Sequence, residues 1–127
     1  INFDVLKNKK KKFLFVYLIK HKNQIILKKR KNTKFLHGLM EIPNNLLNSK
    51  TSLKIAKKNA PLELDWKIVP GKLNSRISNF ELEIRLFKAQ VKQKFFLKNA
   101  IWVNKSEIQK MPIPTLMKNI LSYLNLT

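Results

Sequence analysis

The sequence contains no cysteine among its 127 residues. It can therefore form no disulfide, has no thiolate nucleophile, and lacks the cysteine ligands of iron–sulfur clusters and of Cys-type zinc sites. No apolar run reaches the roughly 18 residues needed to span a bilayer, and the N-terminus has no signal-peptide pattern. We therefore expect a soluble, cytoplasmic protein that does not bind a membrane.

Acidic residues are also scarce. Seven Asp and Glu stand against 27 Lys and Arg, which gives a formal net charge of +20. A field of that sign favours polyanions and predicts salt-dependent binding to nucleic acid. Lysine outnumbers arginine 24 to 3, however, and asparagine is abundant, so AT-rich coding is a second explanation of the basicity. Composition alone leaves both explanations open.

Despite this charge, the composition is that of a folded domain. Hydrophobic residues make up 44% of the chain and include two Trp and eight Phe, which argues against a disordered basic tail. The lysine run at residues 9–12 predicts a basic linker over residues 1–12, followed by a single domain over residues 13–127. Because the chain begins at Ile1 and not at methionine, we expect it to be part of a longer protein.

Hydrophobic patterning predicts an α+β fold. The continuous apolar run at residues 13–19 indicates a buried strand, and residues 24–28 return as its hairpin partner. Leu82, Ile84 and Leu86 alternate with charged residues, as in a half-buried strand. Further elements are predicted as strands at 62–69, 95–97 and 100–103, a turn at 70–72, a helix capped by Asn48 or Thr51 and ending at Asn59, a short helical turn at 105–108, and an amphipathic helix at 115–124.

Some conspicuous side chains have both a structural and a functional interpretation. His21 has no second His, Cys or acid near it in the sequence, so a turn role is favoured over a ligand role. For Trp66 and Trp102 a place in the core is favoured over base stacking. The lysines between residues 50 and 58 indicate a solvated helix face first and phosphate contacts second.

The interval from Ile42 to Leu62 contains no Asp or Glu but four lysines. Mg²⁺ is a hard ion that takes carboxylate and water ligands. A basic segment cannot supply them, so we expect neither a metal site nor a catalytic residue here.

The segment FLHGLMEIP at residues 35–43 contains Gly38, one of only two glycines. It is similar to the GLWEFP-type signature in the Nudix-like C-terminal domain of A/G-specific adenine DNA glycosylases. An ISNF segment before a strand, a Trp-bearing strand and a proline-containing approach to the last helix follow in the family order. The resemblance implies a single domain with a mixed β-sheet flanked by helices, in which the catalytic Nudix box has been lost.

In that family a Phe-Ser-His sequence forms the loop that inspects 8-oxoguanine. By resemblance Ser78 matches the family serine, while Ile77 replaces the phenylalanine and Asn79 replaces the histidine. Oxidation of guanine turns N7 into a donor and adds an O8 acceptor, and a hydroxyl can both accept and donate. The resemblance thus implies lesion contacts for these three residues, which local pattern alone would assign to a turn. Arg76 and Lys72 are predicted phosphate contacts, which position DNA without reading its sequence.

The function implied by the resemblance is base excision repair of 8-oxoguanine:adenine mispairs. This domain would bind the double-stranded DNA as a monomer, without catalytic residues, metal or cofactor. The glycosylase activity and its iron–sulfur cluster would belong to a catalytic domain in the same polypeptide. Two alternatives are a Nudix pyrophosphohydrolase and a sequence-indifferent basic nucleic-acid-binding module, which predicts equal affinity for every duplex.

Overall fold

The computed structural model describes residues 10–29, 39–77 and 80–126. Within these ranges the elements in chain order are β1 (Lys10–His21), β2 (Gln24–Lys29), β3 (Met40–Glu41), β4 (Asn44–Leu47), α2 (Leu53–Lys58), β5 (Lys67–Ile77), β6 (Phe80–Gln90), β7 (Ala100–Asn104), the 3-10 helix η1 (Lys105–Lys110) and α3 (Thr115–Tyr123). The sheet has the strand order β3-β2-β1-β6-β5, with β4 paired to β1 and β7 paired to β2. The predicted α+β fold is confirmed.

The described residues group into two compact units. We call the first the hairpin unit; it contains residues 10–17, 44–77 and 80–88. The second, the α3 unit, contains residues 18–29, 39–43 and 89–126. Strand β1 begins at Lys10, three residues before the predicted start of the domain.

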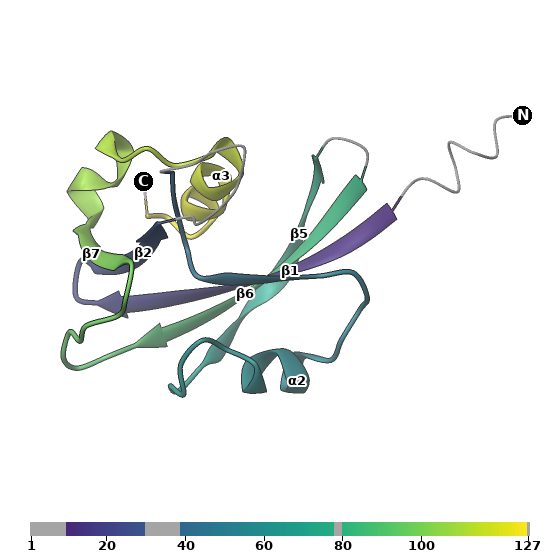
Figure 1. The fold of residues 1–127 in the computed structure, drawn as a ribbon, viewed down its shortest axis with the longest axis horizontal. Helices are drawn as coiled ribbons and strands as arrows, with labels where there is room; N and C mark the ends of the chain where they lie inside the picture. The colour runs from purple at the N-terminus through teal and green to yellow at the C-terminus, as the bar shows by residue number, and fades with distance from the viewer. Residues whose placement is uncertain (1–9, 30–38, 78–79, 127) are drawn as a thin grey trace, which may run out of the picture. The chain divides into compact units, whose positions relative to one another are not determined.

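Aromatic side chains build the core of the hairpin unit. The ring of Tyr17 stacks on Phe87 with centroids 5.5 Å apart, and Trp66 meets Tyr17 edge-on at 5.3 Å. Helix α2 lies alongside strands β1 and β6 (Figure 1), and the Tyr17 hydroxyl donates a hydrogen bond of 2.6 Å to the carbonyl of Ala56. Because Trp66 is only 2% exposed, its predicted place in the core is confirmed.

Helix α2 is shorter than predicted, and its N-cap differs from both predicted candidates. The Oγ atom of Ser52 accepts a hydrogen bond from the Ile55 N–H at 3.2 Å. This bond satisfies one of the amides that a helix leaves unpaired at its start. Asn48 and Thr51 lie upstream of the cap, so that prediction was wrong by one residue or more.

The turn predicted at residues 70–72 is a bulge within one continuous strand. Val69 pairs with Leu86 and Leu73 pairs with Ile84, so three residues of β5 lie opposite the single residue Arg85 of β6. Gly71 has a φ of 87°, a conformation that a glycine adopts without steric cost. The sheet register is thereby kept on both sides of the bulge, where a turn would have ended the strand.

In the α3 unit, β2 pairs along its length with β7 and, near its end, with β3. The predicted amphipathic helix is present as α3. Its buried residues are Met117, Ile120 and Leu121, while Leu116 and Leu124 of the predicted stripe are half-buried. None of the described helices is long and apolar enough to cross a membrane.

The strand predicted at residues 95–97 is absent from the α3 unit. This segment has no strand hydrogen-bonding pattern, and the Phe96 side chain is 88% exposed. The Phe95 carbonyl instead accepts a hydrogen bond of 2.9 Å from Trp102 Nε1. Trp102 is half-buried and also meets the His21 ring edge-on at 6.2 Å, which supports a structural role for both residues.

Candidate functional site

The β5–β6 hairpin carries the residues predicted to contact DNA. Its last described cross-strand pair joins Ile77 to Phe80. Ile77 is half-buried at the end of β5, whereas Ser78 and Asn79 lie outside the described residues. Their roles in lesion recognition therefore stay predictions. Arg76 is exposed and lies opposite Glu81, the next pair along the hairpin.

A cation accompanies the aromatic residue at this end of the hairpin. The ammonium group of Lys12, on β1, lies 4.7 Å from the centroid of the Phe80 ring. Such a cation–π contact holds a lysine in a defined place at modest energy. Lys12 was assigned from the sequence to a linker, but its side chain is half-buried within β1.

Glu83, further along the hairpin on β6, lies close to a second group of cations. Its side chain is 8% exposed, and its Oε1 atom lies 3.3 Å from Lys11 Nζ and 3.6 Å from Lys72 Nζ. Burial alone would raise the pKa of Glu83. The hydrogen bond from Lys11 and the positive charges of Lys72, Lys11 and Lys50 outweigh burial, so the pKa lies below its ordinary value. Glu83 is therefore a carboxylate at neutral pH, and Lys72 is held by it.

Sequence reasoning missed Glu83 because strand β6 is buried on both faces near its centre. The alternation of Leu82, Ile84 and Leu86 suggested that the residues between them face solvent. Phe87 and Glu83 are instead 2% and 6% exposed, on the other face of the strand. A signal was present in the sequence, since Phe87 breaks the alternation with an apolar residue.

Arg85, between these residues, was also missed. Its side chain is half-buried, and among the described residues its Nε atom has no hydrogen-bond partner although it is buried. Because buried donors are normally satisfied, this atom calls for a functional or solvent-based explanation.

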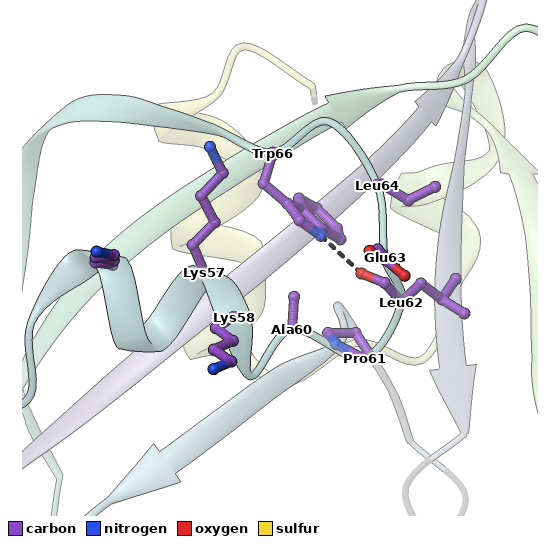
Figure 2. Close-up of a pocket in the computed structure, with 9 residues that line it drawn as sticks. Lys57, Lys58, Ala60, Pro61, Leu62, Glu63, Leu64 and Trp66 are labelled. Atoms are coloured by element: carbon purple, nitrogen blue, oxygen red, sulfur yellow. Dashed lines mark hydrogen bonds between the residues drawn. The ribbon is translucent and has the colours of Figure 1, made fainter.

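A shallow groove of about 440 Å³ lies between α2 and the segment that follows it. Figure 2 shows Trp66 behind this groove, with its Nε1 atom donating a hydrogen bond of 2.8 Å to the carbonyl of Leu62. The groove is lined by Lys54, Lys57, Lys58, Ala60, Pro61, Leu62, Glu63, Leu64 and Trp66. Three lysines and one glutamate are the charged residues of this lining. The Trp66 ring is buried and not available for base stacking.

The residues of this region do not fit a magnesium site. The acid-free interval from Ile42 to Leu62 lies entirely within the described residues and forms β4 and α2. Helix α2 has no acidic residue in its first turn and has Lys57 and Lys58 in its last. Across the described part of the chain, no group of three or more His, Cys, Asp or Glu could hold a metal ion.

The described residues form a β-sheet with a few helices, and the segment that forms β4 and α2 contains no acidic residue. The family model of the NUDIX domain matches residues 14–123, and the chain belongs to this family. A search of curated proteins found no significant match.

Solved structures with the same fold include proteins of different function. The C-terminal domain of mouse MUTYH, in its complex with human PCNA, has a TM-score of 0.67 and 15% identity over 90% of this chain and 87% of that domain. The MutT protein of Methanosarcina mazei Go1 has a TM-score of 0.70 and 16% identity, covering 92% and 94%. The NUDIX domain of Shewanella oneidensis NrtR, in complex with ADP ribose, has a TM-score of 0.61 and 14% identity, covering 100% and 99%. At such identities the similarity shows the fold alone.

Proposed function

We propose that this chain is the non-catalytic, lesion-recognising domain of an adenine DNA glycosylase that acts on 8-oxoguanine:adenine mispairs. The observation that carries the proposal is the register of the β5–β6 hairpin. In the sequence, residues 78 and 79 lie between Ile77 and Phe80, the last cross-strand pair among the described residues. The segment that resembles the family's inspection loop therefore connects two long strands, which can present it to DNA.

The chemistry of the lesion supports a hydroxyl and an amide at this position. Guanine presents two acceptors in the major groove, at N7 and O6. In 8-oxoguanine N7 is a donor and O8 is a new acceptor, so a purely donating side chain loses its match. Ser78 can both accept and donate, and Asn79 carries both functions as well.

Two further observations support a DNA-binding role without catalysis, and a third shows that one domain with this fold has a protein partner. The formal net charge of +20 suits a polyanionic partner. The acid-free interval argues against the metal-dependent hydrolysis of pyrophosphates. The mouse MUTYH domain, which shares the fold, forms a complex with human PCNA. In this proposal adenine excision and the iron–sulfur cluster belong to a catalytic domain elsewhere in the polypeptide, and this domain binds as a monomer without a cofactor.

The test compares two duplexes that differ only in the oxidised base, 8-oxoguanine:adenine and guanine:adenine. We expect this chain to bind the oxidised duplex more tightly, with amide NMR shifts centred on residues 76–80. Ser78→Ala should remove the preference and leave binding to the guanine:adenine duplex unchanged. Ser122→Ala is the matched control, since Ser122 is exposed on α3. Equal binding of both duplexes by the unsubstituted chain would favour the sequence-indifferent basic module.

Nudix hydrolases are also among the structural neighbours, so pyrophosphate hydrolysis is the second candidate function. A pyrophosphohydrolase would release phosphate or pyrophosphate from nucleoside triphosphates in the presence of Mg²⁺ or Mn²⁺. We expect no release above a heat-denatured control. Turnover that depends on the added metal would replace the proposed function with the enzymatic one.

A further inference from the structure

The connection between β6 and β7 presents the most exposed large hydrophobic side chain among the described residues. Phe96 is 88% exposed, whereas the next in order, Leu46, is 52% exposed. All other phenylalanines in the described ranges are buried or half-buried. A single exposed apolar residue is common on protein surfaces, so the surroundings of Phe96 decide whether it has a function.

The residues on both sides of Phe96 are anchored to β7. The Phe95 carbonyl accepts a hydrogen bond of 2.9 Å from Trp102 Nε1, and the two rings meet edge-on with centroids 5.5 Å apart. The Leu97 carbonyl accepts a hydrogen bond of 3.1 Å from the N–H of Ala100, the first residue of β7. The backbone that carries the Phe96 ring is therefore ordered by folding, and a ligand that contacts the ring has less conformational freedom to remove.

Side chains alternate between exposed and half-buried along residues 94–98. Phe95 and Leu97 are half-buried, whereas Lys94, Phe96 and Lys98 are exposed. The exposed side of this segment therefore has one aromatic ring between two ammonium groups in chain order. Lysines alone would indicate a solvated surface, but solvation does not account for the ring between them, because burial of an apolar ring is favourable and its exposure to water is not.

The charge around this segment favours an anionic ligand. The sequence has no Asp or Glu between Glu83 and Glu107, and this interval contains five lysines and one arginine. Among the described residues, neither Lys94 nor Lys98 forms an ion pair. No acid within the described ranges therefore neutralises these two charges, and both are available to phosphate groups.

A single strand of nucleic acid supplies the groups that this surface can bind. Every base has a flat face that stacks on an aromatic side chain whatever the sequence, and phosphates occur on both sides of each base along the strand. The bases of a duplex are stacked on one another, so their faces are closed to an exposed ring. An apolar pocket in a protein partner would also accept a phenylalanine, but it gives no reason for a cation on each side.

We propose that Lys94, Phe96 and Lys98 form a binding site for single-stranded nucleic acid, in which the Phe96 ring stacks on an unpaired base and the two lysines contact the neighbouring phosphates. The inference goes beyond the proposed function. It concerns unpaired bases and a segment of the α3 unit, whereas lesion reading is assigned to residues 78 and 79, between β5 and β6. Stacking uses the face that all bases share, so this site does not depend on oxidation of the base.

The first test measures the binding of fluorescently labelled oligothymidylate by fluorescence anisotropy. Phe96→Ala should weaken this binding by roughly fivefold to a hundredfold, the range found when a stacking aromatic residue is removed. Leu46→Ala is the matched control, because Leu46 is the next most exposed large hydrophobic residue, and it should leave the affinity unchanged. Phe96→Ala removes a ring outside the core, so the amide NMR spectrum should stay that of the folded chain. Equal affinities of Phe96→Ala and of the unsubstituted chain would overturn the site and favour a protein partner for Phe96.

Phe96→Trp reports the stacking contact directly, because stacking on a base quenches indole fluorescence. We expect oligothymidylate to quench this variant more than the unsubstituted chain, in which Trp66 is buried and Trp102 is half-buried. An oligomer of abasic nucleotides keeps the phosphates and lacks the bases, so it should bind without this additional quenching. Equal quenching by both oligomers would overturn the stacking contact.

The salt dependence tests the two lysines. Lys94→Gln should lower the salt slope of log K for oligothymidylate by about 0.7, the value for one phosphate contact on a single strand, while Phe96→Ala should leave the slope unchanged. Lys118→Gln, an exposed charge change on α3, should not alter the slope either. An equal change in both lysine variants would overturn the phosphate contact at Lys94.

A fully base-paired duplex separates this inference from the proposed function. Because its bases are closed to stacking, Phe96→Ala should leave the affinity for this duplex unchanged. An equal loss of affinity for the duplex and for the single strand would overturn stacking on an unpaired base. A chain that binds oligothymidylate through Phe96 but shows no preference for the oxidised duplex has the single-strand site without lesion reading.

Discussion

Lysine side chains have different surroundings in two regions of the hairpin unit. On α2, Lys54, Lys57 and Lys58 are exposed, and among the described residues none of them forms an ion pair. Lys72 at the β5 bulge and Lys11 on β1 both lie close to the Glu83 carboxylate, which is itself buried. The lysines of α2 have no acidic partner among the described residues, whereas Lys72 and Lys11 share one.

This difference shows why the abundance of lysine is a poor guide to function. A solvated lysine loses rotamer freedom when it meets a phosphate. A lysine already fixed by a carboxylate has lost part of that freedom on folding and can bind with less further cost. Position next to a buried acid therefore distinguishes a candidate contact from a solvated face.

The largest expected loss of stability follows from removal of the Trp66 side chain, which lines the groove beside α2. Trp66→Ala should lower the free energy of unfolding by about 3–5 kcal/mol, because a buried aromatic ring and its contact with Tyr17 are lost. Urea denaturation measures this change. Phe96→Ala removes an aromatic ring that is 88% exposed and should change the free energy by less than about 0.5 kcal/mol. Equal losses in the two variants would mean that Trp66 does not support the fold.

Removal of the Glu83 carboxylate should lower the free energy of unfolding by less than removal of Trp66. Glu83→Gln should lower the free energy of unfolding at pH 7 by about 1–2 kcal/mol, between the values for exposed and for buried ion pairs. Glu107→Gln is the control, since Glu107 forms an exposed pair with Lys110 on η1, and its loss should cost less than about 0.5 kcal/mol.

The pH dependence of the Glu83 contribution has a defined sign. The pKa of Glu83 in the folded protein is lowered from its ordinary value of 4.5, so the stabilisation is present above that value. It is lost as the pH falls from 4.5 through the lowered pKa, because the unfolded state takes up the proton first and the folded state only below its own lowered pKa. The difference between Glu83→Gln and the unsubstituted protein should therefore shrink in acid. A constant difference across this range would contradict the ion-pair assignment.

Tyr17→Phe tests the hydrogen bond between β1 and α2. Loss of the hydroxyl leaves the Ala56 carbonyl without this donor and should lower the free energy of unfolding by about 1 kcal/mol. Burial raises the pKa of Tyr17 above its ordinary value of 10.0, against a smaller lowering by Asn45. The stabilisation is then present below pH 10 and lost as the pH rises through the raised pKa. The variant should lack this alkaline loss, and identical alkaline profiles would contradict the prediction.

The smallest change in the free energy of unfolding is expected for substitutions on α2. Substitution of both Lys57 and Lys58 by Gln should change the free energy of unfolding by less than about 0.5 kcal/mol, mostly through the lost cations at the C-terminal end of the helix. The salt slope of duplex binding, measured by fluorescence anisotropy, should stay unchanged while Lys72→Gln lowers it. A fall in slope by about 2 would place α2 in the DNA contact and remove the contrast between the two regions.

Local sequence signals were sufficient for most elements. Continuous apolar runs predicted β1 and β2, the apolar stripe predicted α3, and Pro61 lies shortly after the end of α2, as expected for a residue that cannot continue a helix. The predictions were wrong where one sequence signal is compatible with two different structures. Pro70 and Gly71 suit a bulge as well as a turn, and the aromatic pair at residues 95–96 suits a strand as well as a loop that receives Trp102.

The sequence by itself determined the acid-free interval, the excess of positive charge and the family order of motifs, because these depend only on which residues occur and in what sequence. The tertiary structure alone decided that Glu83 is buried and that Lys11 and Lys72 meet its carboxylate. It also decided that the Arg85 Nε–H is left without a partner among the described residues. Such facts depend on strand register and on a bulge whose three residues pair against one, and no local pattern encodes which distant side chains that register brings together.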